Sequence, residues 1–505
     1  MSYALISVSN KSGLEPLARV LIENGYKLLS TGGTAKMLRE NGFDVMDVSN
    51  FTGSPEILGG RVKTLHPKIY AGILANRADA KHMEQMQTMS FPTIDIVVCN
   101  LYPFEQTTGK QNCTFEQAIE EIDIGGVAMI RAAAKNHQHV VILSNPDQYP
   151  EFIERLQNGR FEPDYKKNLA IYAFKKTCHY DDVISSYFES CQETSAGNEF
   201  SFDKTVNAKQ IMPMRYGENP HQKAGLYSLG MGEWKIEHLH GKEVSYNNIL
   251  DMDAAISTVL EFDSPAAVVV KHLTPCGVAI GKNVLEAYKM ATECDPVSRF
   301  GGIIAINRPC DVVTAEEIMK IKTDIMIATE FLPGALEVFA KKKSTIVIKS
   351  SFTKKPSLSL RSTLFGTLVQ EYDNSIFTEL KVAGTAPVSE NDLKELVFAM
   401  TVAKHVKSNA IVATKGFTTI GVGAGQPNRV GSAKIALEQA GDKSVGCYLA
   451  SDGFIPFPDT IELAKSYGVK AIIEPGGSVN DEKVIEKANE LGIGVVITGQ
   501  RHFLH

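Results

Sequence analysis

The first 145 residues alternate short apolar runs with amphipathic segments, and this alternation limits the folds open to the chain. Residues 3–8 and 26–30 are apolar runs typical of strands, and the amphipathic segment 13–24 between them predicts a helix. Further strands are expected at 94–99 and 140–143. Because strands that alternate with helices form a parallel sheet covered by helices, ligands should bind beyond the carboxyl ends of these strands.

The remainder of the chain predicts a second α/β region. Residues 145–190 are helical in pattern, and the polar stretch 190–202 is typical of a linker. We therefore expect a boundary near residue 195, with domains 1–195 and 196–505. Strands of the second region are predicted at 266–270, 302–306, 411–414, 445–450, 471–474 and 494–498. The segments around Lys271-His272 and Lys407-Ser408-Asn409 each lead into a Gly-containing stretch, which indicates two related subdomains.

Composition excludes several classes of protein. With 505 residues, 44% of them hydrophobic and 22% charged, the chain is typical of a soluble globular protein of two or more domains. A formal net charge of -6 argues against nucleic-acid binding, which requires a basic surface. The eight cysteines form no CxxC pair, and we expect reduced thiols. The sequence shows neither a leader pattern nor a membrane-spanning apolar run, so we expect a cytoplasmic protein with no membrane contact.

Polar loops follow the predicted strands of the first region. The loops SVSNKSG at 7–13 and STGGT at 30–34 each precede a helix, where backbone N–H groups and Lys11 can receive phosphate. Each loop alone is also a common helix N-cap, but two at neighbouring strand ends favour an anion site. The loop GGRVKTLHP at 59–67 adds two cations and a hydroxyl, with a solvated basic loop as the alternative.

Two further motifs complete this set. NLYPF follows the strand at 94–99, and Asp123-Ile124-Gly125-Gly126 opens a helix whose Arg131 and Lys135 share one face. A helix N-terminus with glycine amides can donate hydrogen bonds to an oxyanion.

In this order, SVSNKSG, STGGT, GGRVKTLHP, NLYPF and EIDIGGVAMIRAAAKNH resemble the inosine monophosphate (IMP) cyclohydrolase domain of the bifunctional purine biosynthesis family, over residues 3 to about 145. The resemblance implies a methylglyoxal-synthase-like parallel sheet that closes formamidoimidazole carboxamide ribonucleotide to IMP with loss of water. It implies a nucleotide site of Ser9, Asn10, Lys11, Ser30, Thr31, Gly32, Gly33, Arg61, Thr64, Asn100, Ile124 and Gly125. It places Lys63, Tyr102, Asp123 and Lys135 around the closing ring.

These residue types suit ring closure. A carboxamide nitrogen attacks the formyl carbon and builds an oxyanion, which Lys63 and the Ile124-Gly125 amides can stabilise. Asp123 can orient or deprotonate the amide. Tyr102 and Lys135 are both candidate proton donors for the departing oxygen, and the sequence leaves the choice between them open.

The run Val268-Val269-Val270-Lys271-His272 predicts a buried strand that delivers a lysine and a histidine to a Pro-containing turn. The lysine can stabilise developing negative charge, and the histidine is a base that titrates near neutral pH. A strand-end salt bridge is the alternative. The segments at 214–222 and Ser245-Tyr246-Asn247-Asn248 are loop-like and rich in hydrogen-bonding groups.

Together with VVKHLTPCG, DPVSRFGG, HVKSNAIV, GVGAGQPNRV, DGFIPFPD, EPGGSVND and RHFLH, these segments resemble the aminoimidazole carboxamide ribonucleotide transformylase domain of the same family. The resemblance implies two cytidine-deaminase-like α/β subdomains and formyl transfer from 10-formyltetrahydrofolate, with His272 as the base. Lys271 would stabilise the tetrahedral oxyanion or help protonate the departing folate nitrogen. It implies a nucleotide site of Arg215, Tyr216, Gly301, Asp324, Asn409, Arg429, Phe454 and Arg501. It places Asp459, Ser478 and Val479 against the folate.

Three alternatives and one assembly follow from these patterns. Pro275-Cys276-Gly277 lacks the following x-Cys of zinc deaminases and no His-x-Glu precedes it, so a zinc nucleoside deaminase is disfavoured and no metal is expected. The histidine pairs 137/139 and 238/240 lack nearby Cys or acidic partners and read as surface or core residues. The other alternative is a nucleotide-sensing regulatory module fused to a folate-dependent transferase. The candidate proton donors favour catalysis instead, because nucleotide binding alone does not require a proton donor beside the ring. The resemblance also implies a homodimer.

Overall fold

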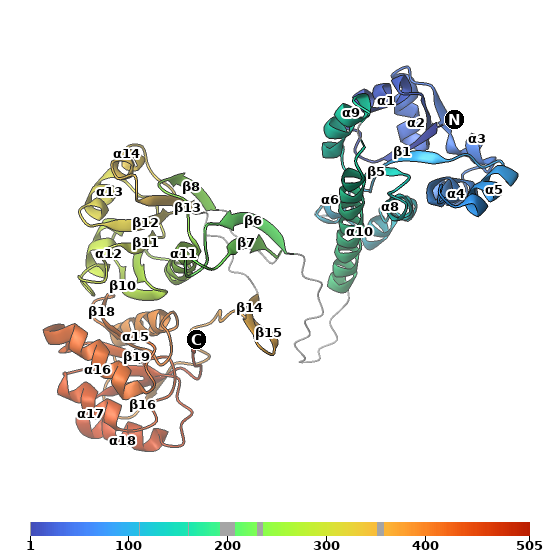
Figure 1. The fold of residues 1–505 in the computed structure, drawn as a ribbon. Helices are drawn as coiled ribbons and strands as arrows, with labels where there is room; N and C mark the ends of the chain where they lie inside the picture. The colour runs from blue at the N-terminus through green and yellow to red at the C-terminus, as the bar shows by residue number, and fades with distance from the viewer. Residues whose placement is uncertain (1, 111, 160, 192–207, 230–235, 351–357) are drawn as a thin grey trace. The chain divides into compact units, whose positions relative to one another are not determined.

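The computed structural model describes residues 2–110, 112–159, 161–191, 208–229, 236–350 and 358–505 (Figure 1). Its contacts divide the chain into two compact units, Met1–Thr205 and Val206–His505. The predicted boundary at residue 195 and most of the predicted linker lie outside the described residues. Each unit is described by itself below.

The first unit is built on a parallel sheet of five strands in the order β3-β2-β1-β4-β5. The strands are β1 (Ser2–Val8), β2 (Tyr26–Ser30), β3 (Val45–Asp47), β4 (Ile94–Asn100) and β5 (Val141–Leu143). The predicted parallel sheet is therefore confirmed. Because the strand order reverses between β1 and β4, the crevice for a ligand lies at the carboxyl ends of these two strands.

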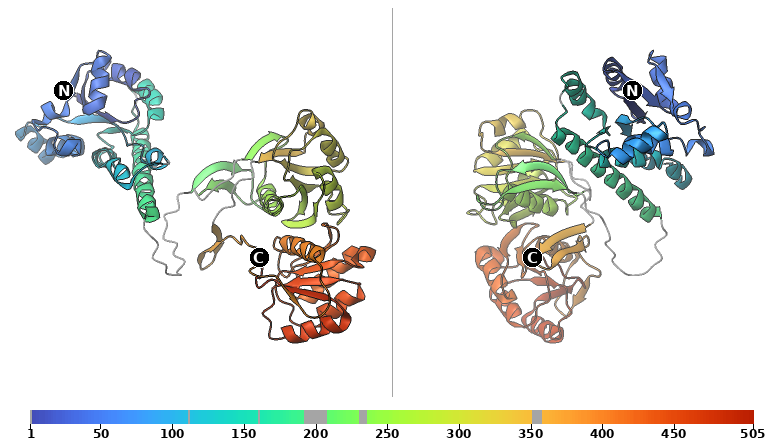
Figure 2. Two further views of the ribbon diagram at one scale, coloured as in Figure 1. Left: turned by 180° about the vertical axis from the view of Figure 1, so that it is seen from behind. Right: turned by 45° about the vertical axis from the view of Figure 1, so that its right-hand side comes forward.

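Helices flank this sheet, and the order of elements is that of a doubly wound domain. They are α1 (Leu14–Glu23), α2 (Gly32–Glu40), α3 (Val48–Thr52), α4 (Pro67–Leu74), α5 (Ala80–Thr88), α6 (Phe104–Thr108), α7 (Phe115–Glu120), α8 (Gly125–Lys135), α9 (Tyr149–Gln157) and α10 (Pro163–Cys191). The helical segment predicted after residue 145 is therefore α9 followed by α10, the long teal helix of Figures 1 and 2. Helix α10 packs along α8, so it belongs to the first unit.

The second unit contains two six-stranded sheets of mixed direction, in the orders β10-β9-β11-β12-β13-β8 and β18-β17-β19-β20-β21-β16. The first comprises β8 (Ile236–His240), β9 (Ala266–Lys271), β10 (Thr274–Ile280), β11 (Gly302–Ile306), β12 (Thr323–Ala328) and β13 (Ile346–Ser350). The second comprises β16 (Lys381–Ala383), β17 (Ile411–Thr414), β18 (Thr419–Gly423), β19 (Tyr448–Ser451), β20 (Ala471–Glu474) and β21 (Gly494–Ile497).

Both sheets follow one plan. Each begins with an antiparallel hairpin, continues with three parallel strands that run opposite to the hairpin's inner strand, and ends in an antiparallel edge strand. The prediction of two related α/β subdomains is confirmed by this shared plan. Their hairpins meet, since Val278 N donates a 2.9 Å hydrogen bond to Thr419 Oγ1 across the two sheets.

The remaining elements of this unit cover the sheets or form small ribbons. The helices are α11 (Tyr246–Val259), α12 (Val284–Ala291), α13 (Val312–Met319), α14 (Ala335–Ala340), α15 (Glu390–Ala403), α16 (Arg429–Ala440), α17 (Asp459–Ser466) and α18 (Asp481–Leu491). The ribbons are β6 (Lys209–Met214) with β7 (Ala224–Ser228), and β14 (Leu358–Thr363) with β15 (Gly366–Glu371). One core of buried side chains from α11, α15 and both sheets joins the two subdomains.

Three local predictions were wrong. The expected Pro-containing turn is the start of β10, and only His272 and Leu273 turn the chain. Pro275 is tolerated because β10 is an edge strand with a register shift at this point. Ser245 is not in a loop but caps α11 through a hydrogen bond from Asn248 N. The strand expected from residue 445 begins at Tyr448.

Candidate active sites

Asn100, the last residue of β4, shapes the loop after β1 at the switch point of the first sheet. Its Oδ1 accepts hydrogen bonds from Ser9 N at 2.7 Å and Asn10 N at 2.9 Å, and its Nδ2 donates to Asn10 O at 2.8 Å. These three bonds join the carboxyl ends of β1 and β4. The Asn100 side chain therefore binds the backbone of the loop at residues 7–13, the proposed phosphate loop. Lys11 of the same loop is exposed.

The STGGT loop uses its hydroxyl groups within the sheet. Ser30 is buried and its Oγ donates to Ile6 O at 2.7 Å. Thr34, which the sequence reasoning did not select, donates to Val8 O at 3.0 Å and accepts from Val8 N at 3.3 Å. The hydroxyls thus anchor β2 and α2 to β1, and the amides of Gly32 and Gly33 at the start of α2 are the groups that suit an anion.

Lys63 lies against this same loop. A Cβ placed on Gly32 would lie 3.7 Å from Lys63 Nζ, and one placed on Gly60 would lie 2.7 Å from Lys63 Cε. Both glycines also have positive φ angles, 49° and 91°. Glycine therefore suits both positions, because it adopts positive φ readily and because it has no Cβ to approach Lys63. The ammonium group also pairs with Glu56 at 3.9 Å, where both side chains are partly exposed.

Asp123 lies at the N-terminus of α8. Its Oδ1 accepts a 2.7 Å hydrogen bond from Gly126 N, and a Cβ on Gly125 would lie 2.8 Å from Thr64 Oγ1. Burial raises the pKa of the Asp123 carboxyl, and the Gly126 amide and the charge of Lys63 only partly oppose that rise. The structure thus brings Lys63, Thr64, Asp123 and the start of α8 together.

A tyrosine of α10 that the sequence did not reveal supports this turn. Tyr180 OH accepts a 2.9 Å hydrogen bond from Asp123 N and donates to Glu121 O at 3.0 Å. No local pattern could have found it, because 57 residues separate Tyr180 from Asp123.

Tyr102 and Arg61 are less enclosed. Tyr102 is 42% exposed, and partial burial together with the nearby Asp123 and Glu121 raises the pKa of its phenol. Arg61 is paired with Glu120 of α7 on the surface. Tyr102 therefore remains beside the Asp123 group, whereas Arg61 points to a protein carboxylate.

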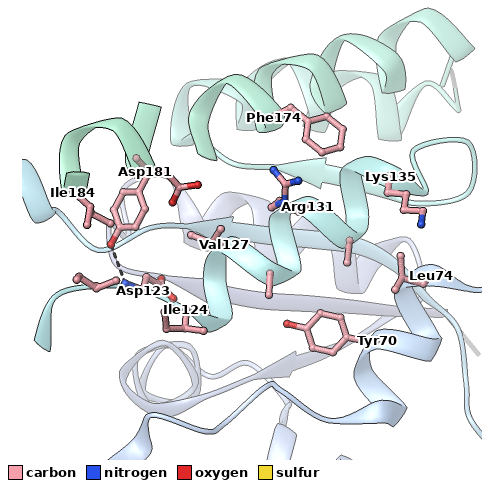
Figure 3. A pocket seen from close by; sticks show the side chains of 14 residues that line it. Tyr70, Leu74, Asp123, Ile124, Val127, Arg131, Lys135, Phe174, Asp181 and Ile184 are labelled. Carbon is pink, nitrogen blue, oxygen red and sulfur yellow. Dashed lines mark hydrogen bonds between the residues drawn. The ribbon is translucent and has the colours of Figure 1, made fainter. Parts of the chain in front are cut away.

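Lys135 lies away from the groups around Asp123. A pocket of about 630 Å³ runs along α8 between α4 and α10, and Asp123 and Lys135 line its opposite ends (Figure 3). The eleven residues of α8 separate them by about 15 Å, because an α-helix rises about 1.5 Å per residue. Tyr70 of α4, another residue missed by sequence reasoning, turns its hydroxyl into this pocket wall without a hydrogen-bond partner in the described protein.

In the second unit, Lys271 ends β9 and is held by backbone carbonyls. Its Nζ donates to Phe300 O and Gly301 O, each at 3.0 Å. A Cβ on Gly301 would lie 3.3 Å from Lys271 Nζ and 3.5 Å from Asp324 Oδ2. The structure therefore brings Lys271, Gly301 and Asp324 together.

His272 follows in a strained turn. His272 and Leu273 have φ angles of 48° and 64°, a region that residues other than glycine seldom adopt. Asp251 of α11, which the sequence reasoning did not select, accepts a 2.7 Å hydrogen bond from Leu273 N. The turn exposes the His272 ring, and such fixed strain is common at functional sites.

A second group forms around Arg429 at the start of α16. Arg429 is buried, and its guanidinium donates to Asp452 Oδ1 at 2.5 Å and to Phe454 O at 2.7 Å. Asp452 also accepts a hydrogen bond from Ser408, next to Asn409. Arg501 stays exposed with its guanidinium carbon 4.9 Å from the centroid of Phe503. Asp452 and Ser408 were missed because their roles depend on contacts with the distant Arg429.

The three folate candidates lie on two adjoining loops. Asp459 opens α17, and Ser478 and Val479 follow β20. Asn480 Nδ2 donates to Pro456 O at 3.0 Å, which joins the two loops. Val479 is fully exposed. Ser478 N donates a 2.9 Å hydrogen bond to Asp481 Oδ1, which holds this loop in place.

Arg215 and Tyr216 follow β6, with the guanidinium carbon 4.9 Å from the tyrosine ring centroid. Asn247 ties the following loop to α11 through a 3.2 Å hydrogen bond to Glu218 O. Across the described residues, we find no hydrogen bond that joins the Lys271, Arg215 and Arg429 groups to one another. The structure therefore assembles these groups separately.

The described part of the chain holds no cluster of three His, Cys, Asp or Glu residues suited to a metal ion. Among the same residues, no helix is both long and apolar enough to cross a bilayer.

The fold and these sites define a class: a methylglyoxal-synthase-like domain joined to a pair of α/β subdomains. Residues 13–128 match the MGS-like domain, and residues 133–439 match the AICARFT/IMPCHase bienzyme family, named for aminoimidazole carboxamide ribonucleotide formyltransferase and IMP cyclohydrolase. The chain is similar to the bifunctional purine biosynthesis protein PurH of Prochlorococcus marinus (strain MIT 9211), at 46% identity over 99% of both chains. The PurH proteins of Halalkalibacterium halodurans and Bacillus cereus (strain B4264) are 48% identical over the same share. The chain therefore belongs to the AICARFT/IMPCHase bienzyme family.

Proposed function

We propose that this chain performs the last two steps of IMP synthesis with one active centre in each unit. It is a bifunctional enzyme of purine biosynthesis, with a formyltransferase activity that uses 10-formyltetrahydrofolate and a cyclohydrolase activity. Residues 1–195 form the cyclohydrolase domain and residues 196–505 the formyltransferase domain. The chain is similar over its full length to bifunctional purine biosynthesis proteins, and nothing supports the alternative of a regulatory module.

In the cyclohydrolase, the nucleotide phosphate binds at the amides of Gly32 and Gly33 and at the loop that Asn100 shapes. The carboxamide nitrogen then attacks the formyl carbon. Lys63 and the amides at the start of α8 stabilise the oxyanion, since they lie at one end of the sheet beside Asp123. Asp123 orients the amide and accepts its proton, and Tyr102 is a proton donor for the leaving water.

Lys135 acts on the ring of a second copy in a homodimer. The backbone position of Lys135 lies about 15 Å along α8 from the turn that holds Asp123, farther than one lysine side chain spans. Mixing Lys135→Ala with Asp123→Asn subunits tests this arrangement. Each mixed dimer would hold one complete site, so ring closure should recover to about a quarter of the normal rate. No recovery in dimers shown to have mixed would refute it.

In the formyltransferase, His272 takes the proton of the attacking 5-amine, which is a weak nucleophile because its lone pair is delocalised toward the carboxamide. Lys271, fixed by two carbonyl oxygens, stabilises the tetrahedral oxyanion. When the oxyanion collapses, the bond between the formyl carbon and the folate nitrogen breaks, and that nitrogen takes a proton with the help of Lys271, which releases tetrahydrofolate. Asp324 and Gly301 border the same position. Arg215, Tyr216, Asn409, Phe454 and Arg501 hold the nucleotide, and Arg429 supports them through Asp452. The folate binds at Asp459, Ser478 and Val479.

The separation of the two catalytic groups into two compact units carries this proposal. Lys63→Ala should slow ring closure of pre-formylated nucleotide by roughly 100-fold and leave formyl transfer intact, and His272→Ala should do the reverse. Absorbance of the formylated nucleotide and release of tetrahydrofolate follow the two reactions. A folded His272→Ala protein with normal formyl transfer would overturn the assignment. Sedimentation and cell fractionation test the proposed homodimer and cytoplasmic location.

A further inference from the structure

A buried histidine near the C-terminus, His502, binds residues 500–505 to the segment that precedes β16. The proposed mechanism does not use this side chain. The His502 side chain is fully buried, and its two ring nitrogens face different acceptors. Nδ1 lies 2.6 Å from Asp373 Oδ2, and Nε2 lies 2.9 Å from Ile376 O. Asp373 and Ile376 precede β16, so this contact closes a loop of 129 residues.

Both nitrogens of this ring are engaged. A carbonyl oxygen only accepts hydrogen bonds, so Nε2 donates to Ile376 O. Nδ1 faces the Asp373 carboxyl group. Burial raises the pKa of Asp373, but the interactions with His502 outweigh burial and keep that pKa below its ordinary value.

Other charged and polar groups face this pair from the neighbouring elements. Gln500 Nε2 donates to Asp373 Oδ1 at 3.3 Å, and Gln500 Oε1 accepts from Ser375 at 2.7 Å. Lys404, the C-cap of α15, donates to Ser375 O at 3.3 Å and pairs with Glu261 at 3.2 Å. The positive charge of Lys404 lowers the pKa of Asp373 further, and Glu261 opposes that effect.

The histidine backbone connects this pair to the Arg429 group. His502 N donates to Asp452 O at 2.8 Å, and Asp452 holds Arg429. Two residues later, Leu504 O accepts from Ser408 N at 2.9 Å, beside Asn409. Phe503 lies between two guanidinium groups, with Arg429 at 5.7 Å and Arg501 at 4.9 Å from its centroid. The strip 501–504 thus carries the one exposed arginine of this group at a fixed position.

We propose that His502 is a positioning residue for nucleotide binding in the formyltransferase. Its ring, held by Asp373 and by Ile376 O, fixes the C-terminal strip so that the Arg501 guanidinium is already ordered when the anionic nucleotide arrives. This inference rests on the proposed function, because it requires Arg501 to contact the nucleotide. His502 itself touches neither substrate.

The test uses His502→Gln in the full-length protein. The KM for the aminoimidazole nucleotide should rise about ten- to a hundredfold, the range that follows from losing a hydrogen bond to a charged group. Both kcat for formyl transfer and the rate of ring closure should stay within about twofold. Asp373→Asn should reproduce the KM effect, and His502→Gln should add nothing in an Arg501→Ala background.

Controls separate this inference from a general loss of stability. His405→Gln removes a partly buried histidine that faces a carboxylate, at 3.0 Å from Glu261, and should lower the melting temperature without changing the nucleotide KM. If Arg501→Ala leaves the KM unchanged, the proposed nucleotide site is wrong. If Arg501→Ala raises the KM while folded His502→Gln does not, the positioning role is refuted.

A measurement on the unmutated protein covers the case in which His502→Gln fails to fold. Nitrogen NMR of the histidine-labelled enzyme should show one buried imidazole ring with both nitrogens hydrogen-bonded, and Asp373→Asn should shift the Nδ1 signal of that ring. A His502 ring whose Nδ1 signal does not respond to Asp373→Asn would overturn the proposal.

Discussion

Glu474 ends β20 with its carboxyl group buried beneath the proposed folate loops. The residue is 1% exposed, its Oε2 accepts a 2.6 Å hydrogen bond from Ile455 N, and its Oε1 has no hydrogen-bond partner in the described protein. Burial, which is the main cause, raises the pKa of Glu474 from its ordinary 4.5 to about 7, and Arg429 only partly opposes it. The folded protein therefore keeps this side chain protonated at mildly acidic pH.

The sign and size of the effect follow from proton linkage. Below about pH 4.5 both the folded and the unfolded states hold the proton, so Glu474 causes no pH dependence there. As the pH rises toward 7, the unfolded state releases the proton first, and the second unit loses stability. At about 1.4 kcal/mol for each tenfold difference in proton affinity, the total loss is roughly 3 kcal/mol.

Glu474→Gln removes this dependence, because the amide cannot ionise. Its stability relative to the wild type should increase by about 2 to 3 kcal/mol between pH 5 and pH 8. Any constant cost of burying the amide cancels in this comparison. Urea titration with pulsed hydrogen exchange, read on peptides from β20 and β21, measures the second unit separately from the first.

Glu482→Gln, on the exposed side of α18, is the matched control and should follow the wild type at both pH values. An identical difference between Glu474→Gln and the wild type at pH 5 and pH 8 would refute the reasoning.

Three further results are expected. Asn100→Ala leaves two backbone amides without their acceptor, so the first unit should lose roughly 1–3 kcal/mol and ring closure should slow while formyl transfer is kept, as measured by urea denaturation and both assays. Because burial raises the pKa of Asp123, ring closure should decline as the pH falls at values above those usual for an aspartate, and Asp123→Asn should be slower by roughly 100-fold with that decline abolished. Gly126→Ala would place a Cβ 2.3 Å from Asp123 Oδ2, so steady-state kinetics should show loss of ring closure with formyl transfer kept. Normal ring closure in Gly126→Ala would contradict the proposed place of the carboxylate.

Local patterns predicted part of the secondary structure and the content of the site loops. The apolar runs predicted β1, β2, β4 and β5 of the first unit and β9, β11, β17, β19, β20 and β21 of the second, because an apolar run is visible in neighbouring residues alone. They missed the other strands of the two mixed sheets, which are β8, β10, β12, β13, β16 and β18, and the strands of both small ribbons. The wrong predictions had local causes too. The Pro275 turn and the Ser245 loop were inferred from residue types that edge strands and helix caps also use.

The sequence by itself determined which chemistry the loops carry: cations, hydroxyls and glycine amides after the strands of the first unit, and Lys271-His272 at the end of a buried strand. Only the tertiary structure decided which of these groups meet. It brought Asp324 beside Lys271, turned Asn100 onto the loop at Ser9, and buried His502 against Asp373. The physical reason is that such contacts depend on strand order and register, which bring together residues as many as 129 positions apart. The residues next to each partner in the sequence do not show which distant residue it will contact.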